Sequence, residues 1–226
     1  MAMTDDLLTF IIREKIVIMG IGVALILALA FWIFGSCKDR TANNFIIFNC
    51  VVILYDFVFE LAFLINNSRD VEFLFLPTLI AFSVPLIVNF MMAFITIIIQ
   101  CFIADNKDER KKFQKWFTDN LRFAAVMTIL AGADINFLRL MTSRFGKFEM
   151  FSCKFSRTAI KIIVLVEFFN SFIEDIPQFT IQVLYKLNTT GYSTIPFISL
   201  VLSSLVLLLN IIVRIYDVVL QFTYDS

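Results

Sequence analysis

Long apolar runs are the feature that most constrains how this chain of 226 residues can fold. Five stretches are dominated by apolar residues over about 18 residues or more, the length that a helix needs to cross a bilayer. In hydrocarbon, only helices and closed barrels satisfy the backbone hydrogen-bonding groups. We therefore predict an all-α, polytopic transmembrane helical bundle with spans at residues 16–34, 44–65, 73–103, 162–187 and 197–220.

The segments around these spans complete a single integral membrane domain, residues 1–226. Residues 1–15 place Leu and Ile on one helical face and predict an interfacial N-terminus. Pro77 and Pro85 predict a bend or an early turn in the third span. Residues 104–161 mix basic and aromatic side chains, so we predict a cytoplasmic, amphipathic and partly embedded region there.

The composition argues against most enzyme chemistry. The chain is 60% hydrophobic and contains no histidine, so the commonest general base and metal ligand is missing. Its four cysteines are isolated from one another, which disfavours a metal site or a disulfide framework. Nucleotide-binding and hydrolase motifs are absent from the sequence, as is a basic stripe for nucleic acid. We predict a protein that is not an enzyme and has no cofactor, no metal and no nucleic-acid partner.

Basic residues bear on whether residues 123–141 cross the membrane. If this segment crosses, giving six spans, the two sides of the membrane receive 8 and 9 Lys and Arg residues. If it only dips into the bilayer as a non-crossing or re-entrant helix, the division becomes 14 against 4. Because basic loops are retained in the cytoplasm, the second arrangement is favoured, with the N-terminus outside. Both arrangements, five and six spans, stay open at this stage.

Polar side chains form one-sided stripes inside several spans. Charged residues in a membrane helix persist where they face protein, water or one another. The stripes supply a candidate path for lipid headgroups or ions, in which Pro177 bends the helix. The path residues are Asp56, Glu60, Glu174, Gln178, Gln182, Arg214 and Asp217. The alternative is that the same side chains hold helices together through buried polar contacts.

Three stretches resemble the XK-related membrane proteins, a family that includes apoptotic phospholipid scramblases. "EDIPQFTIQ" at residues 174–182 resembles the family signature E-x-x-P-Q-L-x-L-Q, "LYDFVFELAFL" resembles an acidic helix, and "RIYDVVL" resembles a charged helix end. The sequence departs from the family at Asn170, where an acid is usual, and at Glu60, which stands for an Asp. The likeness covers about half of the family architecture, so a complete lipid path would need a homodimer or larger membrane complex.

The resemblance implies movement of phospholipids along the acidic furrow without ATP, with membrane phospholipids as partners. Two alternatives use the same residues differently. A cation channel or proton-coupled transporter would employ the acids directly, and a structural accessory subunit would need them for assembly only. We expect an integral membrane location and favour the plasma membrane over an organelle.

Overall fold

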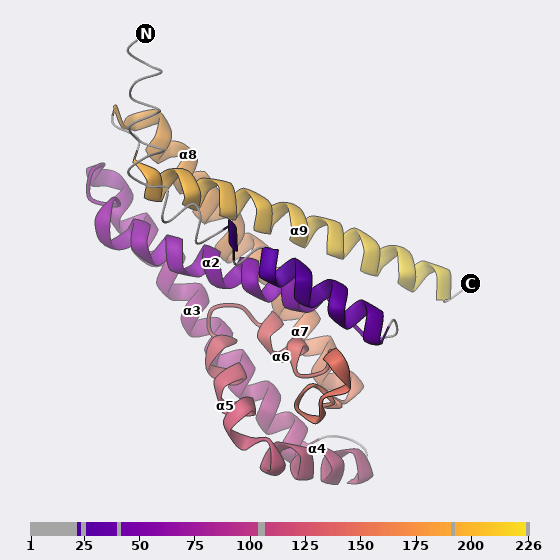
Figure 1. The fold of residues 1–226 in the computed structure, drawn as a ribbon. Helices are drawn as coiled ribbons and strands as arrows, with labels where there is room; N and C mark the ends of the chain where they lie inside the picture. The colour runs from indigo at the N-terminus through magenta and orange to yellow at the C-terminus, as the bar shows by residue number, and fades with distance from the viewer. Residues whose placement is uncertain (1–21, 24–25, 40–41, 104–106, 191–192, 225–226) are drawn as a thin grey trace. The chain divides into compact units, whose positions relative to one another are not determined.

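The structure is a computed structural model that describes residues 22–23, 26–39, 42–103, 107–190 and 193–224, with side chains up to Ile212 in the last helix (Figure 1). The described residues are helical or irregular and include no strand, which confirms the all-α class. The chain divides into two compact units, which are described separately here. Unit 1 comprises residues 1–55 and 86–167, and unit 2 comprises residues 56–85 and 168–226.

Three helices are shared between the units because the chain passes from one unit to the other within them. They are α2 (Phe45–Asn66), α3 (Phe75–Ile98) and α7 (Arg157–Asn170). The boundary in α3 follows Pro85, a residue that lacks the backbone N–H needed for the regular helical hydrogen bond. Pro77 lies at the third position of the same helix, where a proline is tolerated.

Unit 1 contains the helical segment Ile26–Lys38 and the short helices between α3 and α7. A π-helical turn, η2 (Ile99–Ile103), precedes α4 (Lys107–Asp119), α5 (Leu121–Leu130) and α6 (Asn136–Leu140), and the 3₁₀ turns η3 (Phe145–Lys147) and η4 (Glu149–Phe151) follow. Apolar side chains from these elements and from α2, α3 and α7 form one core. Phe113 of α4 is buried in it and lies 5.5 Å from Phe155, ring centre to ring centre. The apolar face of α4 therefore packs against protein.

Unit 2 contains η1 (Glu72–Leu74), the π-helical turn η5 (Ser171–Asp175), α8 (Ile176–Asn188) and α9 (Thr194–Tyr224). Figure 1 shows α8 and α9 running side by side, and side-chain hydrogen bonds join them. A small apolar core gathers Phe63, Leu74, Ala81, Ile181 and Tyr185. At one end of the unit, the Tyr185 hydroxyl donates to Asp70 at 2.7 Å, which ties α8 to the turn after α2.

The apolar runs lie in helices at the expected places. Among the described residues, three helical stretches are long and apolar enough to span a membrane: Phe45–Asn66, Glu72–Ile103 and Thr194–Ile212. They indicate a membrane protein. The expected span at 162–187 consists of α7, η5 and α8, so a π-helical turn interrupts it. The interfacial segment 1–15 lies outside the described residues. In the first span, residues 22–23 and 26–34 are described and helical, and residues 16–21 and 24–25 lie outside the described residues.

Residues 123–141 form two short helices separated by a turn. α5 has 10 residues, which correspond to about 15 Å of rise, roughly half of a hydrocarbon core. The turn at 131–135 precedes α6, and the Asn136 backbone N–H donates to the Asp134 carboxylate at 2.6 Å. Such a local side-chain bond competes with helix continuation and explains why the two helices do not merge.

Candidate functional site

Two acids of α2 meet α9 inside unit 2. Asp56 and Glu60 lie one helical turn apart on the same face of α2, and both are buried. The Ser203 hydroxyl lies 2.9 Å from Asp56 Oδ1 and 3.3 Å from Glu60 Oε1. A hydroxyl has one proton, so it donates to one carboxylate at a time, and the shorter distance favours Asp56. The two acids therefore compete for the same donor.

Gln182 of α8 connects this pair to a second serine. Its side-chain Nε2 donates to Ser199 at 2.7 Å and to Ser203 at 3.1 Å, which uses both amide hydrogens. Its Oε1 atom is buried and has no hydrogen-bond partner among the described residues. Gln178, one turn earlier in α8, donates to the backbone carbonyl of Ala81 at 3.3 Å. Both glutamines predicted for the path thus point into the interior of unit 2.

The π-helical turn η5 brings a further acid into the cluster. Asp175 is buried and accepts hydrogen bonds from Ser171 at 2.8 Å and from Asn210 of α9 at 2.9 Å. Regular helical spacing places Glu174 on the stripe with Gln178 and turns Asp175 away. A π-helical turn holds an extra residue, so it shifts the side chains before it relative to those after it. Helical spacing alone therefore does not place Asp175 in the site. The feature of the sequence that could have indicated it is Pro177, which follows the π-helical turn.

The eight buried residues that these bonds and helices bring together are called the polar cluster below. They are Asp56, Glu60, Asp175, Gln178, Gln182, Ser199, Ser203 and Asn210. Glu174 is half-buried, and its carboxylate, like those of Asp56 and Asp175, lies within electrostatic range of Glu60. Pro177 occupies the first turn of α8, directly after η5. Arg214 and Asp217 belong to α9, but their side chains lie outside the described residues.

A polar cavity and an apolar groove adjoin one another beside this cluster. The cavity is lined by Glu60, Thr78, Gln178, Gln182 and four apolar side chains, and its volume of about 10 Å³ matches roughly one water molecule. The groove, of about 550 Å³, lies between α3 and α8 and ends at η5. Ala81 and Ile181 line both. We call this groove the α3–α8 groove; its residues are Pro77, Ile80, Ala81, Val84, Ile173, Ile176, Pro177, Thr180 and Ile181.

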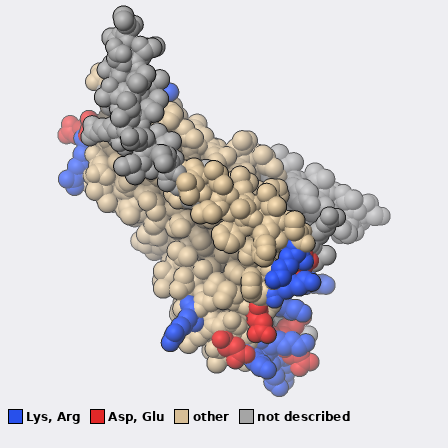
Figure 2. All heavy atoms as spheres, in the orientation of Figure 1, with Lys and Arg blue, Asp and Glu red and all other residues tan. Residues whose placement is uncertain are grey.

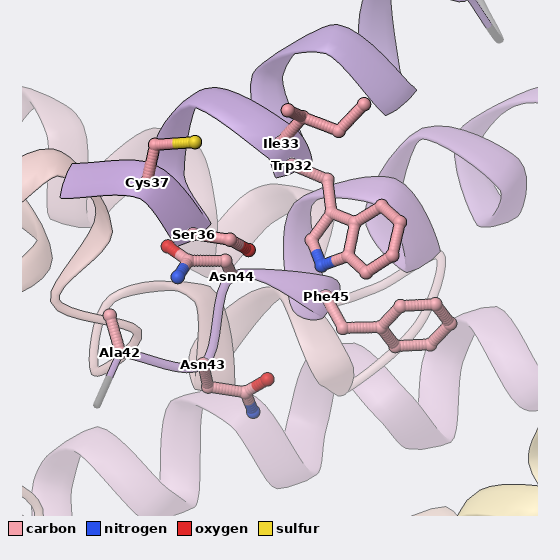
Figure 3. Close-up of a pocket in the computed structure, with 8 residues that line it drawn as sticks. All are labelled: Trp32, Ile33, Ser36, Cys37, Ala42, Asn43, Asn44 and Phe45. Carbon is pink, nitrogen blue, oxygen red and sulfur yellow. The ribbon is translucent and has the colours of Figure 1, made fainter. Parts of the chain in front are cut away.

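A second pocket, of about 490 Å³, lies in unit 1 (Figure 3). It is lined by Trp32, Ile33, Ser36, Cys37, Ala42, Asn43, Asn44 and Phe45. These lining residues include no acid and no base, and none of the predicted path residues. Although this pocket is larger than the polar cavity, its lining contains none of the acids of the predicted path, and it is not the candidate site.

Regular helical spacing predicts Glu167 on the same stripe as Glu174, but Glu167 is part of unit 1. Its carboxylate pairs with Arg139 of α6 at 3.0 Å and accepts a hydrogen bond from Asn136 at 3.3 Å. This pair is mostly buried, so Arg139 supplies the charge that Glu167 needs. Sequence reasoning missed the pairing because the two residues are far apart along the chain. Glu167 therefore stabilises the packing of α6 against α7.

Comparison with family models, with curated proteins and with solved structures finds no match for this chain.

The chemistry of the site therefore has to be judged from its residues. The XK-related resemblance continues to rest on the quoted stretches, of which "EDIPQFTIQ" supplies three members of the polar cluster, Asp175, Gln178 and Gln182. Among the described residues, no group of three or more His, Cys, Asp or Glu is placed to hold a metal ion. What the cluster offers is a set of carboxylates, amides and hydroxyls inside a helical bundle, beside an apolar groove.

Proposed function

We propose that this protein moves phospholipids across its membrane, down their gradient and without ATP, along the polar cluster of unit 2. The observation that carries the proposal is the shared wall of the α3–α8 groove and the polar cavity, formed by Ala81 and Ile181. A phospholipid needs an apolar site for its chains and a polar site for its headgroup, next to each other. These two sites are adjacent within one compact unit.

The chemistry of each site suits one part of the lipid. The groove is lined by two prolines and by aliphatic side chains that are partly exposed, such as Ile80 and Ile176, which favours an acyl chain. The acids Asp56, Glu60, Glu174 and Asp175 attract the ammonium group of a choline or ethanolamine headgroup. Gln178 and Gln182 extend the polar path with amide groups. The sequence pattern alone predicts that Arg214 and Asp217 extend this path, since their side chains lie outside the described residues.

Passage of a headgroup requires the cluster to open, because the cavity has room for about one water molecule. Opening at the shared wall means that α8 separates from α3. Pro177 and the preceding π-helical turn are the natural place for this movement. A proline removes one backbone hydrogen bond and frees a carbonyl, which can then bind water or a headgroup.

The same proposal includes the five-span arrangement, with residues 104–161 in the cytoplasm. Within unit 1, Asn43 donates its backbone N–H to Ser143 at 3.0 Å, and Trp116 donates to Glu149 at 2.8 Å. Within unit 2, Asn67 lies 3.4 Å from Ser193. If residues 123–141 crossed the membrane, both Asn43–Ser143 and Asn67–Ser193 would join segments on opposite sides. These contacts therefore support five spans with a non-crossing segment and, by the positive-inside rule, a cytoplasmic middle.

A second candidate function is transport of protons or small cations by the same acids. The observation that favours it is the Gln182 Oε1 atom, which is buried beside a cavity of water size and lacks a donor. A single water molecule, or a small cation without its hydration shell, would supply that donor or charge without any opening of α8 from α3. The size of the transported species thus separates the two candidates.

Reconstitution in liposomes tests the proposal directly. Vesicles carry a fluorescent phospholipid in both leaflets, and a membrane-impermeant reductant then bleaches the accessible label. We expect bleaching beyond the outer leaflet for the protein and not for empty vesicles. The double variant Asp56→Asn, Glu60→Gln should lower the rate about tenfold, which corresponds to roughly 1.4 kcal/mol on the barrier. Asp119→Asn, Glu149→Gln removes two exposed acids of unit 1 and serves as the matched control.

A pH-sensitive dye trapped in the same vesicles reports proton entry in parallel. Proton or cation flux without lipid exchange, lost in the Asp56→Asn, Glu60→Gln variant, would replace the lipid proposal with the second candidate. If neither lipid exchange nor ion flux occurs in monomeric or dimeric preparations, the remaining interpretation is a structural accessory subunit. Ile181→Trp fills the shared wall and provides a further arm, since it should slow lipid exchange while leaving the three acids of the cluster and Glu174 in place.

A further inference from the structure

Unit 1 carries a basic surface, whereas the polar cluster belongs to unit 2. The segment 144–154 exposes Arg144, Lys147, Phe148, Met150 and Lys154, which we call the 144–154 surface. Figure 2 shows Lys and Arg gathering, with fewer acids, over the end of unit 1 that Figure 1 draws as α4 and the loops after α6. Residues 107–161 carry twelve Lys and Arg against five Asp and Glu, so this part of unit 1 has a clear positive charge.

The backbone of the segment is held in one conformation. Arg144, Gly146 and Lys147 have φ values of 57°, 57° and 62°, in the left-handed region. The Arg144 N–H donates to the Phe151 carbonyl at 2.8 Å, and the Cys153 N–H donates to the Met141 carbonyl at 3.0 Å. These bonds close the segment into a tight turn. The backbone therefore loses little further conformational entropy when a ligand binds.

Aromatic residues of the segment take two different roles. Phe145 and Phe151 pack edge to face at 5.7 Å, and Phe145 is buried, so these rings anchor the turn to the core. Phe148 and Met150 instead remain 50% and 40% exposed. The Trp116 indole N–H of α4 donates to the carbonyl of Glu149, the residue between Phe148 and Met150. This bond holds the backbone in a conformation that leaves both side chains exposed. An exposed aromatic and a methionine among basic residues form an amphipathic surface.

The surface lies where apolar helices begin and end. The helical segment Ile26–Lys38 ends at Lys38, whose ammonium group lies 5.0 Å from the centre of the Phe148 ring. The helix α7 begins at Arg157, three residues after Lys154. In a membrane protein, the ends of apolar helices lie at the level of the lipid headgroups. The segment is therefore close to a membrane surface, and in the five-span arrangement that surface is the cytoplasmic leaflet.

We propose that the 144–154 surface binds anionic phospholipid headgroups of the cytoplasmic leaflet, with Phe148 and Met150 inserting between them. Charge complementarity identifies the occupant, because that leaflet carries a negative surface potential that attracts Lys and Arg. The exposed Phe148 and Met150 side chains add apolar contact with the lipid. Such contact contributes to binding at the membrane interface but not to purely electrostatic binding. Each basic residue strengthens such association about fivefold. The inference rests on the proposed topology and is independent of lipid transport.

A nitroxide label at Met150→Cys tests the proposal on the full chain in nanodiscs. Cys37→Ser and Cys101→Ser remove the more accessible native thiols, while Cys50 and Cys153 are buried. The discs contain either phosphatidylcholine alone or phosphatidylcholine with phosphatidylserine. We expect phosphatidylserine to raise the collision rate of the label with oxygen and to lower that with a water-soluble nickel complex. High salt should reverse the change.

Charge variants identify the residues responsible. The double variant Lys147→Gln, Lys154→Gln should raise more than tenfold the phosphatidylserine fraction that gives half of the change in collision rate, or should abolish that change. The double variant Lys147→Arg, Lys154→Arg should preserve it. Arg69→Gln, Lys186→Gln removes two exposed basic residues of unit 2 and should leave it unchanged. A label equally exposed to water in both lipids would overturn the proposal. So would binding of a soluble acidic peptide with no phosphatidylserine response, which would indicate a protein partner.

Discussion

Ser203 of α9 donates a hydrogen bond to the Asp56 carboxylate of α2, and the two oxygens are 2.9 Å apart. The residues are separated by 147 positions along the chain. Ser203 also accepts from Gln182 of α8, so one hydroxyl joins three helices of unit 2. Removal of a buried donor takes one hydrogen bond from the carboxylate that it serves, which is costly in a medium of low polarity.

The first prediction concerns Ser203. We expect Ser203→Ala to lower the free energy of unfolding by about 1–3 kcal/mol, because Asp56 and Gln182 each lose a buried hydrogen bond. The neighbouring Ser204 bonds only to the Leu200 carbonyl of its own helix among the bonds described, so Ser204→Ala is the matched control and should have little effect. Thermal unfolding in detergent measures both. Equal destabilisation by the two variants would contradict the role given to Ser203.

The second prediction concerns the pair of Arg139 and Glu167. Removal of one partner should destabilise the protein by about 2 kcal/mol, less than for a fully buried pair, because Arg139 is 25% exposed. The double variant Arg139→Met, Glu167→Met should recover much of that loss, since it leaves no uncompensated charge. A double-mutant cycle from thermal unfolding gives the coupling energy. Purely additive effects would show that the two charges do not stabilise each other.

The third prediction concerns membrane topology. Asn66 and Asn188 begin the two N-x-S/T sequons and lie at the same end of unit 2, where Asn67 approaches Ser193. Both sites should therefore be on the outer side. When Gly–Ser spacers lengthen the two loops, both sequons should be glycosylated in a microsomal translation assay. A sequon inserted after Lys147 should remain unmodified, and its glycosylation would refute the five-span arrangement.

The fourth prediction concerns the cysteines. Burial, with a smaller contribution from nearby Cys101, raises the pKa of the Cys153 thiol well above its usual range, whereas Cys37 is exposed. Cys37 should react with a maleimide near neutral pH, and Cys153 should react only after unfolding, as mass spectrometry of digested protein can show. Because the folded pKa is raised, this thiol favours the folded state below the unfolded value of about 8.5 and loses that contribution as pH rises above it. Labelling of Cys153 in the native protein at rates similar to Cys37 would contradict its burial.

The spans and the polar character of the site follow from local patterns in the sequence. Apolar runs at 44–65, 73–103 and 197–220 coincide with helices because a segment of that length and composition has no other stable form in a bilayer. Asp56 and Glu60, one turn apart in α2, are both buried as regular helical spacing indicates. Gln178 and Gln182 obey the same rule because α8 is regular from Ile176 onwards.

Tertiary structure decided which acids share a site. The π-helical turn before Pro177 shifts the helical phase, so that Asp175 rather than Glu174 bonds to Asn210. Arg139 takes Glu167 out of the expected stripe through a contact between residues 28 positions apart. Helical periodicity relates residues that are three or four positions apart, so it cannot reveal either effect. Apolar length determines the helices, because it acts along one segment, whereas polar partners are chosen between segments and depend on how those segments pack.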